Sequence, residues 1–143
     1  MLCVDVNVLV DAFRQTAPAH REVRSWLDAA AEGPEQIGVL PYVGSAFVRI
    51  VTNRRIFREP TPPAEAIGFV DSLLSAPRVL LVPPGRAHWS VFSGLVRDLH
   101  LTGDDVPDAF IAAAAMDLRA TLVTSDRGFR RFPGLRTLEP AAA

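Results

Sequence analysis

The sequence predicts a three-layer α/β domain built around a short parallel sheet of four to five strands. Short apolar stretches rich in β-branched residues alternate with longer segments whose apolar residues recur at helical spacing. Such alternation is typical of right-handed β–α–β crossovers, which place helices on both faces of a parallel sheet. The 143 residues are 49% hydrophobic and 22% charged. Because no repeat, linker or low-complexity tract interrupts them, we expect a single domain over 1–143.

The first part of the chain predicts a strand followed by two helices. Met1–Val6 reads as a buried strand because its apolar residues are nearly continuous, and Val8–Phe13 continues as a helix. A second helix is expected over Ala19–Ala31, and Gly33 with the proline after it ends that helix. Its apolar face has i, i+3, i+4, i+7 spacing and consists of Val23, Trp26, Leu27 and Ala30.

The same alternation continues through the middle of the chain. Ile37–Leu40 is the second expected strand, and Pro41 opens a helix that runs to about Asn53. The prolines over 60–63 form a loop before a helix at Ala64–Ser75. The remaining expected elements are a strand at Arg78–Val82, a helix at Ala87–Leu99, a helix from Pro107 through Arg119, a strand at Thr121–Thr124 and an edge strand at Leu135–Leu138.

Composition limits the class of protein. All 15 basic residues are arginine, the net charge is −1, and Cys3 is the only cysteine, which excludes an internal disulfide and a cysteine-rich zinc site. An arginine-only surface suits phosphate contacts, although a GC-rich genome would produce the same bias. Without an apolar run of about 20 residues or a basic segment before the first apolar run, we expect a cytoplasmic protein with no membrane contact.

Acidic residues follow several of the apolar stretches. Asp5 and Asp126 end expected strands, and Asp108 lies in the first turn of an expected helix. Ligands of open α/β sheets bind at the carboxyl ends of the strands. Two carboxylates about 4 Å apart repel by about 4 kcal/mol at an effective dielectric of about 20, so such a cluster needs a cation. Oxygen ligands favour Mg²⁺ or Mn²⁺ over zinc.

Each of these acids also has an ordinary structural explanation. Asp5 could simply cap the helix that follows it, and Asp126 could belong to a turn into Phe129. Asp104 or Asp105 is the expected cap of the helix from Pro107, whereas Asp108 is better placed for function. Asp11, the weakest of the acidic signals, is expected at the surface. The agreement among the acids, rather than any one of them, predicts the metal site.

Four motifs together resemble a PIN domain, and specifically a VapC-type toxin ribonuclease of bacterial toxin–antitoxin pairs. They are Val4-Asp5-Val6-Asn7-Val8-Leu9, Phe47-Val48-Arg49-Ile50-Val51-Thr52-Asn53, Val106-Pro107-Asp108-Ala109, and Thr121-Leu122-Val123-Thr124-Ser125-Asp126-Arg127-Gly128-Phe129 with Phe132-Pro133-Gly134-Leu135 behind it. Their order and spacing cover nearly the whole chain.

The resemblance implies an endoribonuclease that depends on Mg²⁺, or on Mn²⁺ in its place, and cuts structured RNA such as a tRNA or rRNA loop. Asp5, Asp108 and Asp126 would hold the metal, Thr124 would orient water or substrate, and Asn7 would position Asp5. The resemblance also implies a homodimer and a VapB-like antitoxin. Arginines near the strand ends, namely Arg14, Arg49 and Arg127, are candidates for gripping the RNA.

One departure from the family pattern concerns the acidic set. PIN toxins usually carry a glutamate before the Phe-x-Arg segment, and this chain has Ala46 there, with Gly128 at another position that is often acidic. Asp105 could supply the missing charge; otherwise a second metal is weak or absent. A PIN fold that binds RNA or protein without cutting it is therefore the alternative. A receiver domain or a haloacid dehalogenase-type phosphatase is disfavoured because both need a lysine, whereas a DNA-directed nuclease stays open.

Overall fold

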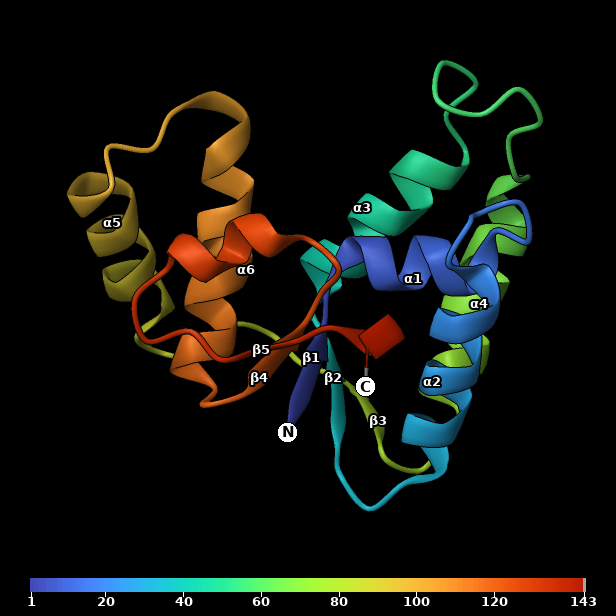
Figure 1. The fold of residues 1–143 in the computed structure, drawn as a ribbon, viewed down its shortest axis with the longest axis horizontal. Helices are drawn as coiled ribbons and strands as arrows, with labels where there is room; N and C mark the ends of the chain where they lie inside the picture. Colours follow the sequence, from blue (N-terminus) through green and yellow to red (C-terminus); the bar gives the residue numbers. More distant parts are fainter. Residues whose placement is uncertain (143) are drawn as a thin grey trace.

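A fully parallel sheet forms the centre of the molecule (Figure 1). The structure, a computed structural model, describes residues 1–142, and the strand order is β3-β2-β1-β4-β5. The strands are β1 (Leu2–Val4), β2 (Ile37–Val39), β3 (Val79–Leu81), β4 (Thr121–Val123) and β5 (Thr137–Leu138). The predicted parallel sheet is confirmed, and it has five strands.

The middle strand, β1, pairs with two strands that are far apart in the sequence. Leu2 lies opposite Ile37 of β2 on one side and Thr121 of β4 on the other. The register continues to the pair Val4 and Val123, after which both strands end. Residues that follow β1 and β4 therefore meet at one edge of the sheet.

Helices cover both faces of this sheet, which confirms the three layers. The helices are α1 (Val6–Phe13), α2 (His20–Glu32), α3 (Pro41–Val51), α4 (Pro63–Leu74), α5 (His88–Asp98) and α6 (Val106–Asp117), with short 3₁₀ turns η1 (Gly103–Asp105), η2 (Arg127–Arg131) and η3 (Pro140–Ala142). Figure 1 shows α5 and α6 on one side of the strands and α1, α2 and α4 on the other. No helix within residues 1–142 combines the length and apolar character needed to cross a bilayer.

Local chemistry explains where the expected boundaries moved. The first strand stops at Val4 rather than Val6, and α1 starts at Val6 rather than Val8, because the carboxylate of Asp5 accepts the Val6 backbone N–H at 2.7 Å. The helix from Pro41 ends at Val51 rather than about Asn53, and the Asn53 backbone N–H donates to the Ile50 carbonyl, three residues back, at 3.1 Å. The expected side-chain cap of α6 is not formed; a 3₁₀ turn leads into the helix instead.

The core holds the strand ends rigidly below the site. Helix α6 lies between α5 and the sheet, so most of its residues are buried, namely Ala109, Ile111, Ala112, Ala113, Ala114 and Ala115. On the other face, the ring of Phe47 in α3 lies 5.6 Å from that of Phe13 and 5.3 Å from that of Phe69. These contacts fix α1, α3 and α6 around the carboxyl edge of β1.

Candidate active site

A pocket of about 480 Å³ opens at the carboxyl edge of the sheet. Asp5, Asp108 and Asp126, the three acids predicted for the site, all line it. Asp5 follows β1, Asp126 follows β4, and Asp108 lies in the first turn of α6. The topology thus brings together three acids that are far apart in the sequence.

Asp5 has a dual position, because it caps a helix and also faces the pocket. The residue is 5% exposed, and its backbone N–H donates to the Val123 carbonyl at 2.9 Å, which ties it to β4. One carboxylate oxygen, Oδ1, accepts the Val6 N–H that begins α1. The helix cap and the pocket position predicted for Asp5 therefore coexist in one residue.

Thr124 and Asn7 hold the second oxygen of Asp5. The Thr124 hydroxyl donates to Asp5 Oδ2 at 2.7 Å, and the Asn7 side-chain amide donates to the same oxygen at 3.0 Å. The Thr124 oxygen also accepts the Asp126 backbone N–H at 3.0 Å. Asn7 completes the connection by accepting the Ser125 N–H at 3.2 Å. The hydroxyl of Thr124 is thus engaged with the acids themselves.

Asp126 is oriented by its own turn. Its Oδ1 accepts the Gly128 backbone N–H at 2.8 Å, which caps the 3₁₀ turn η2. The turn predicted for this residue is therefore present, and Asp126 also lines the pocket. As with Asp5, a single carboxylate serves the local backbone and faces the shared cavity.

Arg131 joins two of the acids. Its Nη2 lies 3.2 Å from Asp108 Oδ2 and 3.4 Å from Asp105 Oδ1, and its Nη1 donates to the Gly128 carbonyl at 3.1 Å. The guanidinium also lies 4.8 Å from the centre of the Phe132 ring. Asp105, with 60% of its side chain exposed, does not line the pocket and reaches the site only through this arginine.

Burial and mutual repulsion raise the pKa of the pocket acids. Burial raises the pKa of Asp5 above its ordinary value; hydrogen bonds from Thr124 and Val6 oppose the rise, and the charges of Asp108 and Asp126 add to it. Burial also raises the pKa of Asp108, against the hydrogen bond and charge of Arg131. The carboxylates therefore repel one another, and a bound cation would relieve that repulsion.

The donor set suits a hard cation, since every acid in the pocket offers carboxylate oxygen. Within residues 1–142, no three acidic, histidine or cysteine side chains converge closely enough to hold one ion between them. Mg²⁺ commonly takes one or two carboxylates and keeps water molecules for the rest, so it fits such a looser arrangement. Arg131 forms an ion pair with Asp108, so a cation would compete with this arginine for the Asp108 carboxylate.

Sequence reasoning missed two charged residues of the site. Asp11, expected at the surface, lines the pocket one turn of α1 beyond Asn7, and burial raises its pKa. The i, i+4 spacing of Asn7 and Asp11 could have shown this. Arg131 follows Asp126 by five positions, and only the 3₁₀ turn η2 carries it back to the acids. Nothing in its local sequence indicates that return.

Apart from its acids the pocket is lined mainly by apolar residues, and the part contributed by α1, α3 and the loop after α3 is called the apolar wall. Ala46, which stands where a glutamate was expected from the family pattern, is 8% exposed and lines the pocket. Val10, Ile50, Ile56 and Phe57 line the same pocket. The pocket therefore combines several carboxylates with a largely hydrocarbon lining.

Fold and site together define a PIN-domain protein: the PIN domain family model matches residues 2–135. Ribonuclease VapC43 of Mycobacterium tuberculosis is 45% identical over 140 residues, covering 98% of this chain and 95% of that protein. Ribonuclease VapC31 of the same species is 38% identical over 98% of this chain and 99% of its own length. The chain belongs to the PIN-domain family, within its VapC ribonucleases.

Solved structures agree on the fold. VapBC2 of Rickettsia felis, bound to a DNA fragment from its promoter, matches with a TM-score of 0.71 at 20% identity, covering 96% of both chains. VapC20 of Mycobacterium tuberculosis, described as a sarcin–ricin loop cleaving toxin, matches with a TM-score of 0.65 at 15% identity over 91% of this chain and 93% of that one. At these identities the likeness concerns the fold alone.

Proposed function

We propose that this VapC ribonuclease is a toxin that uses Mg²⁺, or Mn²⁺ in its place, to hydrolyse phosphodiester bonds in a structured RNA loop. The observation that carries the proposal is the single pocket that Asp5, Asp108 and Asp126 all line. The curated relatives that are similar over nearly the full chain are named ribonucleases, which supports the same activity.

The acids and their neighbours would divide the work among them. Asp5, Asp108 and Asp126 would hold the ion directly or through water. Asp105, which lies outside the pocket beside Arg131, would add negative charge nearby. Bound there, the ion would stabilise charge on the phosphodiester oxygens and promote ionisation of a water molecule. Thr124 and Asn7 would keep Asp5 in place, because both donate to its Oδ2.

Cleavage of RNA in the presence and absence of metal tests this proposal. Purified protein should cut total RNA with Mg²⁺ or Mn²⁺ and stop with EDTA, and Asp108→Asn should lose most of the activity. Asp98→Asn is the matched control, since Asp98 is an exposed acid on α5 outside the pocket. Sequencing the new RNA ends identifies the target.

The alternative is a PIN fold that binds RNA or protein without cutting it. Ala46 is the observation that favours this alternative, because an apolar wall reduces the number of carboxylates available to metal. If protein free of antitoxin leaves RNA intact with both metals, the binding module is the better description.

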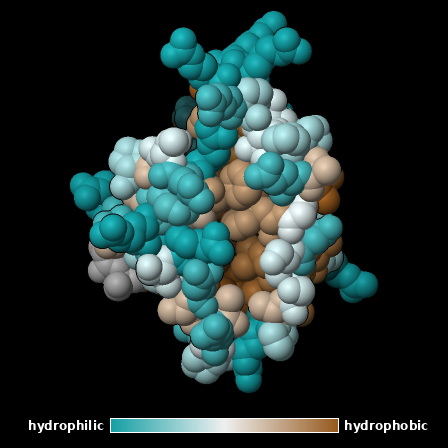
Figure 2. Space-filling view, turned by 90° about the vertical axis from the view of Figure 1, so that its right-hand side faces the viewer, coloured by the Kyte–Doolittle hydropathy of each residue, from teal (hydrophilic) through white to brown (hydrophobic). Residues whose placement is uncertain are grey.

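We further propose a VapB-like antitoxin as partner, docked in an apolar groove between α2 and α4. Figure 2 shows a hydrophobic hollow on this face, between two more polar ridges. The groove has a volume of about 710 Å³, and its apolar lining includes Leu27, Ala31, Phe69, Leu73 and Ala76. An amphipathic helix commonly lays its apolar face into a groove of this kind.

Neutralisation by the antitoxin is measured as loss of RNA cleavage. The cognate antitoxin should suppress cleavage by the wild-type protein, and Ala31→Arg, which places a large cation in the groove, should restore cleavage in its presence. Ala64→Arg on the exposed start of α4 is the control. If Ala31→Arg is neutralised as well as the control, the antitoxin binds elsewhere.

A homodimer in the cytoplasm completes the proposal. Trp89 on α5 is 72% exposed and lies against Phe92, with ring centres 5.4 Å apart, which leaves a large apolar surface for a second copy. Light scattering should give a dimer mass for the wild type and a monomer mass for Trp89→Ser. A wild-type monomer would refute the dimer.

A further inference from the structure

The apolar wall of the acid pocket has no role in holding a cation. We propose that it is a subsite for an unpaired nucleobase next to the phosphodiester that the acids face. This inference rests on the ribonuclease function proposed above and names the part of the RNA that the pocket receives.

One stripe of α3 forms half of the subsite. Tyr42, Ala46, Arg49 and Ile50 lie at i, i+4, i+7 and i+8, and all four line the pocket. Tyr42 is 38% exposed, with its ring 4.9 Å from that of Phe110, which holds it at the margin. Because the side chain of Ala46 is short and uncharged, it leaves an apolar surface at the centre of this stripe, against which a base could stack.

The loop between α3 and α4 supplies the other half. Ile56 and Phe57 line the pocket, and their backbone N–H groups both donate to the Asn53 carbonyl at 3.0 Å. The guanidinium of Arg14 lies 4.0 Å from the centre of the Phe57 ring. Arg14 also donates to the Glu59 carbonyl at 3.0 Å, so the loop is anchored to the end of α1. The wall is therefore formed before any ligand binds.

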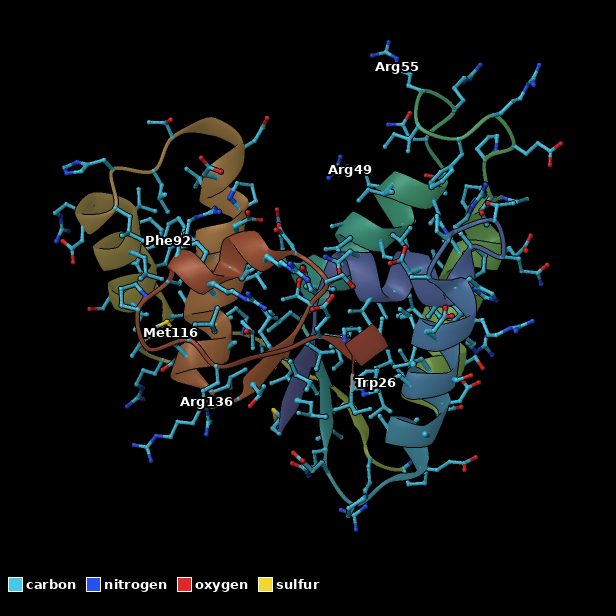
Figure 3. The ribbon with its side chains drawn as sticks, in the orientation of Figure 1. Trp26, Arg49, Arg55, Phe92, Met116 and Arg136 are labelled. Carbon is cyan, nitrogen blue, oxygen red and sulfur yellow. The ribbon has the colours of Figure 1, made fainter. Side chains whose placement is uncertain are left out.

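The charges beside this wall favour nucleic acid as the occupant. Arg49 is exposed and forms no ion pair with any residue in 1–142. Figure 3 shows Arg49 projecting from α3 and Arg55 at the tip of the loop, and Arg54 and Arg58 are exposed beside Arg55. Arginine pairs with phosphate through a planar fork of donors. The apolar wall would contact a base, the exposed arginines beside it would contact the RNA backbone, and the acids of the pocket would face the scissile phosphate.

The geometry also selects the kind of RNA. A base inside a duplex is stacked and paired, so it can enter a side pocket only from a loop, a bulge or a single strand. Stacking on aromatic and apolar side chains tolerates different bases, because every base has a flat face. We therefore expect preference for unpaired RNA, with sequence preference left to contacts outside this wall.

Binding of oligonucleotides with and without bases tests the subsite. The probes are 2′-O-methyl oligomers of uridine or adenosine about twelve nucleotides long, and an abasic oligomer of equal charge, measured by fluorescence anisotropy with Ca²⁺ present. The wild-type protein should bind the base-containing oligomers at least about five-fold more tightly than the abasic one. Gels run after each titration check that the probes stay intact.

Matched variants locate the preference. Ile56→Ser should reduce the preference for bases, and Tyr42→Ala/Ile56→Ser should abolish it, while affinity for the abasic oligomer stays within about two-fold of wild type. Ile67→Ser is the control, because Ile67 on α4 is 50% exposed, Ile56 is 51% exposed, and Ile67 does not line the pocket. Circular dichroism confirms that each variant folds, and the single variant serves if the double variant does not.

Two results overturn the subsite. One is equal affinity of the wild-type protein for base-containing and abasic oligomers, and the other is a preference that the pocket variants keep. If those variants instead lose only neutralisation by the antitoxin, the wall contacts protein and the proposal fails. Cleavage of total RNA with Mg²⁺ by the same preparation tests the ribonuclease function separately, so either proposal can fail while the other stands.

Discussion

Replacing Thr124 with valine removes one hydroxyl at the centre of the acid network and almost no volume. That hydroxyl donates to Asp5 Oδ2 at 2.7 Å and accepts from the Asp126 N–H at 3.0 Å. Asp5 is 5% exposed and Thr124 is 4% exposed, so water cannot readily replace the lost bond. Thr124→Val should therefore destabilise the metal-free protein, and we expect the pKa of Asp5 to rise further.

The size of the effect follows from the charge on Asp5. A hydrogen bond to an ionised group contributes about 1.5–3 kcal/mol, whereas one between neutral groups contributes about 0.5–1.5 kcal/mol. Thr124→Val should thus lower the free energy of unfolding by about 1.5–3 kcal/mol where Asp5 is ionised, and by about 0.5–1.5 kcal/mol where it is protonated. The difference between the two conditions identifies the carboxylate as the partner.

Urea unfolding of the wild type, Thr124→Val and Thr124→Ser at two pH values measures this difference. Thr124→Ser keeps the hydroxyl and should lose less stability than the valine variant at the higher pH. The lower pH is chosen below the titration of Asp5, which the pH dependence of wild-type stability locates. An equal loss for Thr124→Val above and below that titration would show that the hydroxyl does not stabilise an ionised Asp5. A valine variant as stable as the wild type at both pH values would refute the network altogether.

Three further predictions concern charge in the same pocket. Arg131→Gln should tighten Mn²⁺ binding about five-fold, because an exposed ion pair is worth about 1 kcal/mol and Arg131 competes for Asp108; calorimetry showing unchanged affinity would rule out that competition. Since the pKa values of Asp5, Asp11 and Asp108 are raised in the folded protein, the folded state binds more protons than the unfolded chain just above the ordinary carboxyl pKa range. The metal-free protein should therefore become more stable as pH falls from neutral towards that range, and Mg²⁺ should raise Tm more at about pH 7.5 than at about pH 5.5; the opposite order contradicts the sign of these shifts. Ala46→Glu should lower the metal-free stability by about 1–3 kcal/mol more than Ala46→Gln at neutral pH, with Mn²⁺ restoring the difference; thermal unfolding that shows no rescue would mean that position 46 lies outside the reach of the metal.

The fold could be predicted from the sequence because periodicity and strand length determine it. The strands at Ile37–Val39 and Thr121–Val123 fall within their expected ranges, and so does the two-residue edge strand at Thr137–Leu138. The boundary between β1 and α1 at Asp5 was harder to predict from the sequence, because apolar β-branched residues continue into Val6. Only the cap hydrogen bond from the Val6 N–H to Asp5 shows where the helix starts. Such ends depend on side-chain geometry that propensity does not carry.

Pocket residues could be predicted from the sequence where an acid directly follows a strand. They could not be predicted where a turn or loop brings a residue to the pocket. Asp5 and Asp126 have a positional signal, since parallel strands end at one edge of the sheet. Arg131 has none, because its contact with Asp108 depends on the path of η2. The apolar wall was hidden for the same reason: Ile56 and Phe57 belong to a loop, and a loop's course is set by contacts such as that of Arg14 with Glu59.

The placement of β1 between β2 and β4 has a consequence for synthesis of the protein in the cell. Asp5 is synthesised early, but the hydroxyl that donates to it belongs to Thr124, 119 positions later. The acceptor of its backbone N–H, the carbonyl of Val123, is also made late. A nascent chain that lacks β4 contains Asp5 without Asp126 or Thr124, so the acid pocket cannot form on it. During synthesis the acid pocket therefore cannot form until β4 and the residues that follow it have been made.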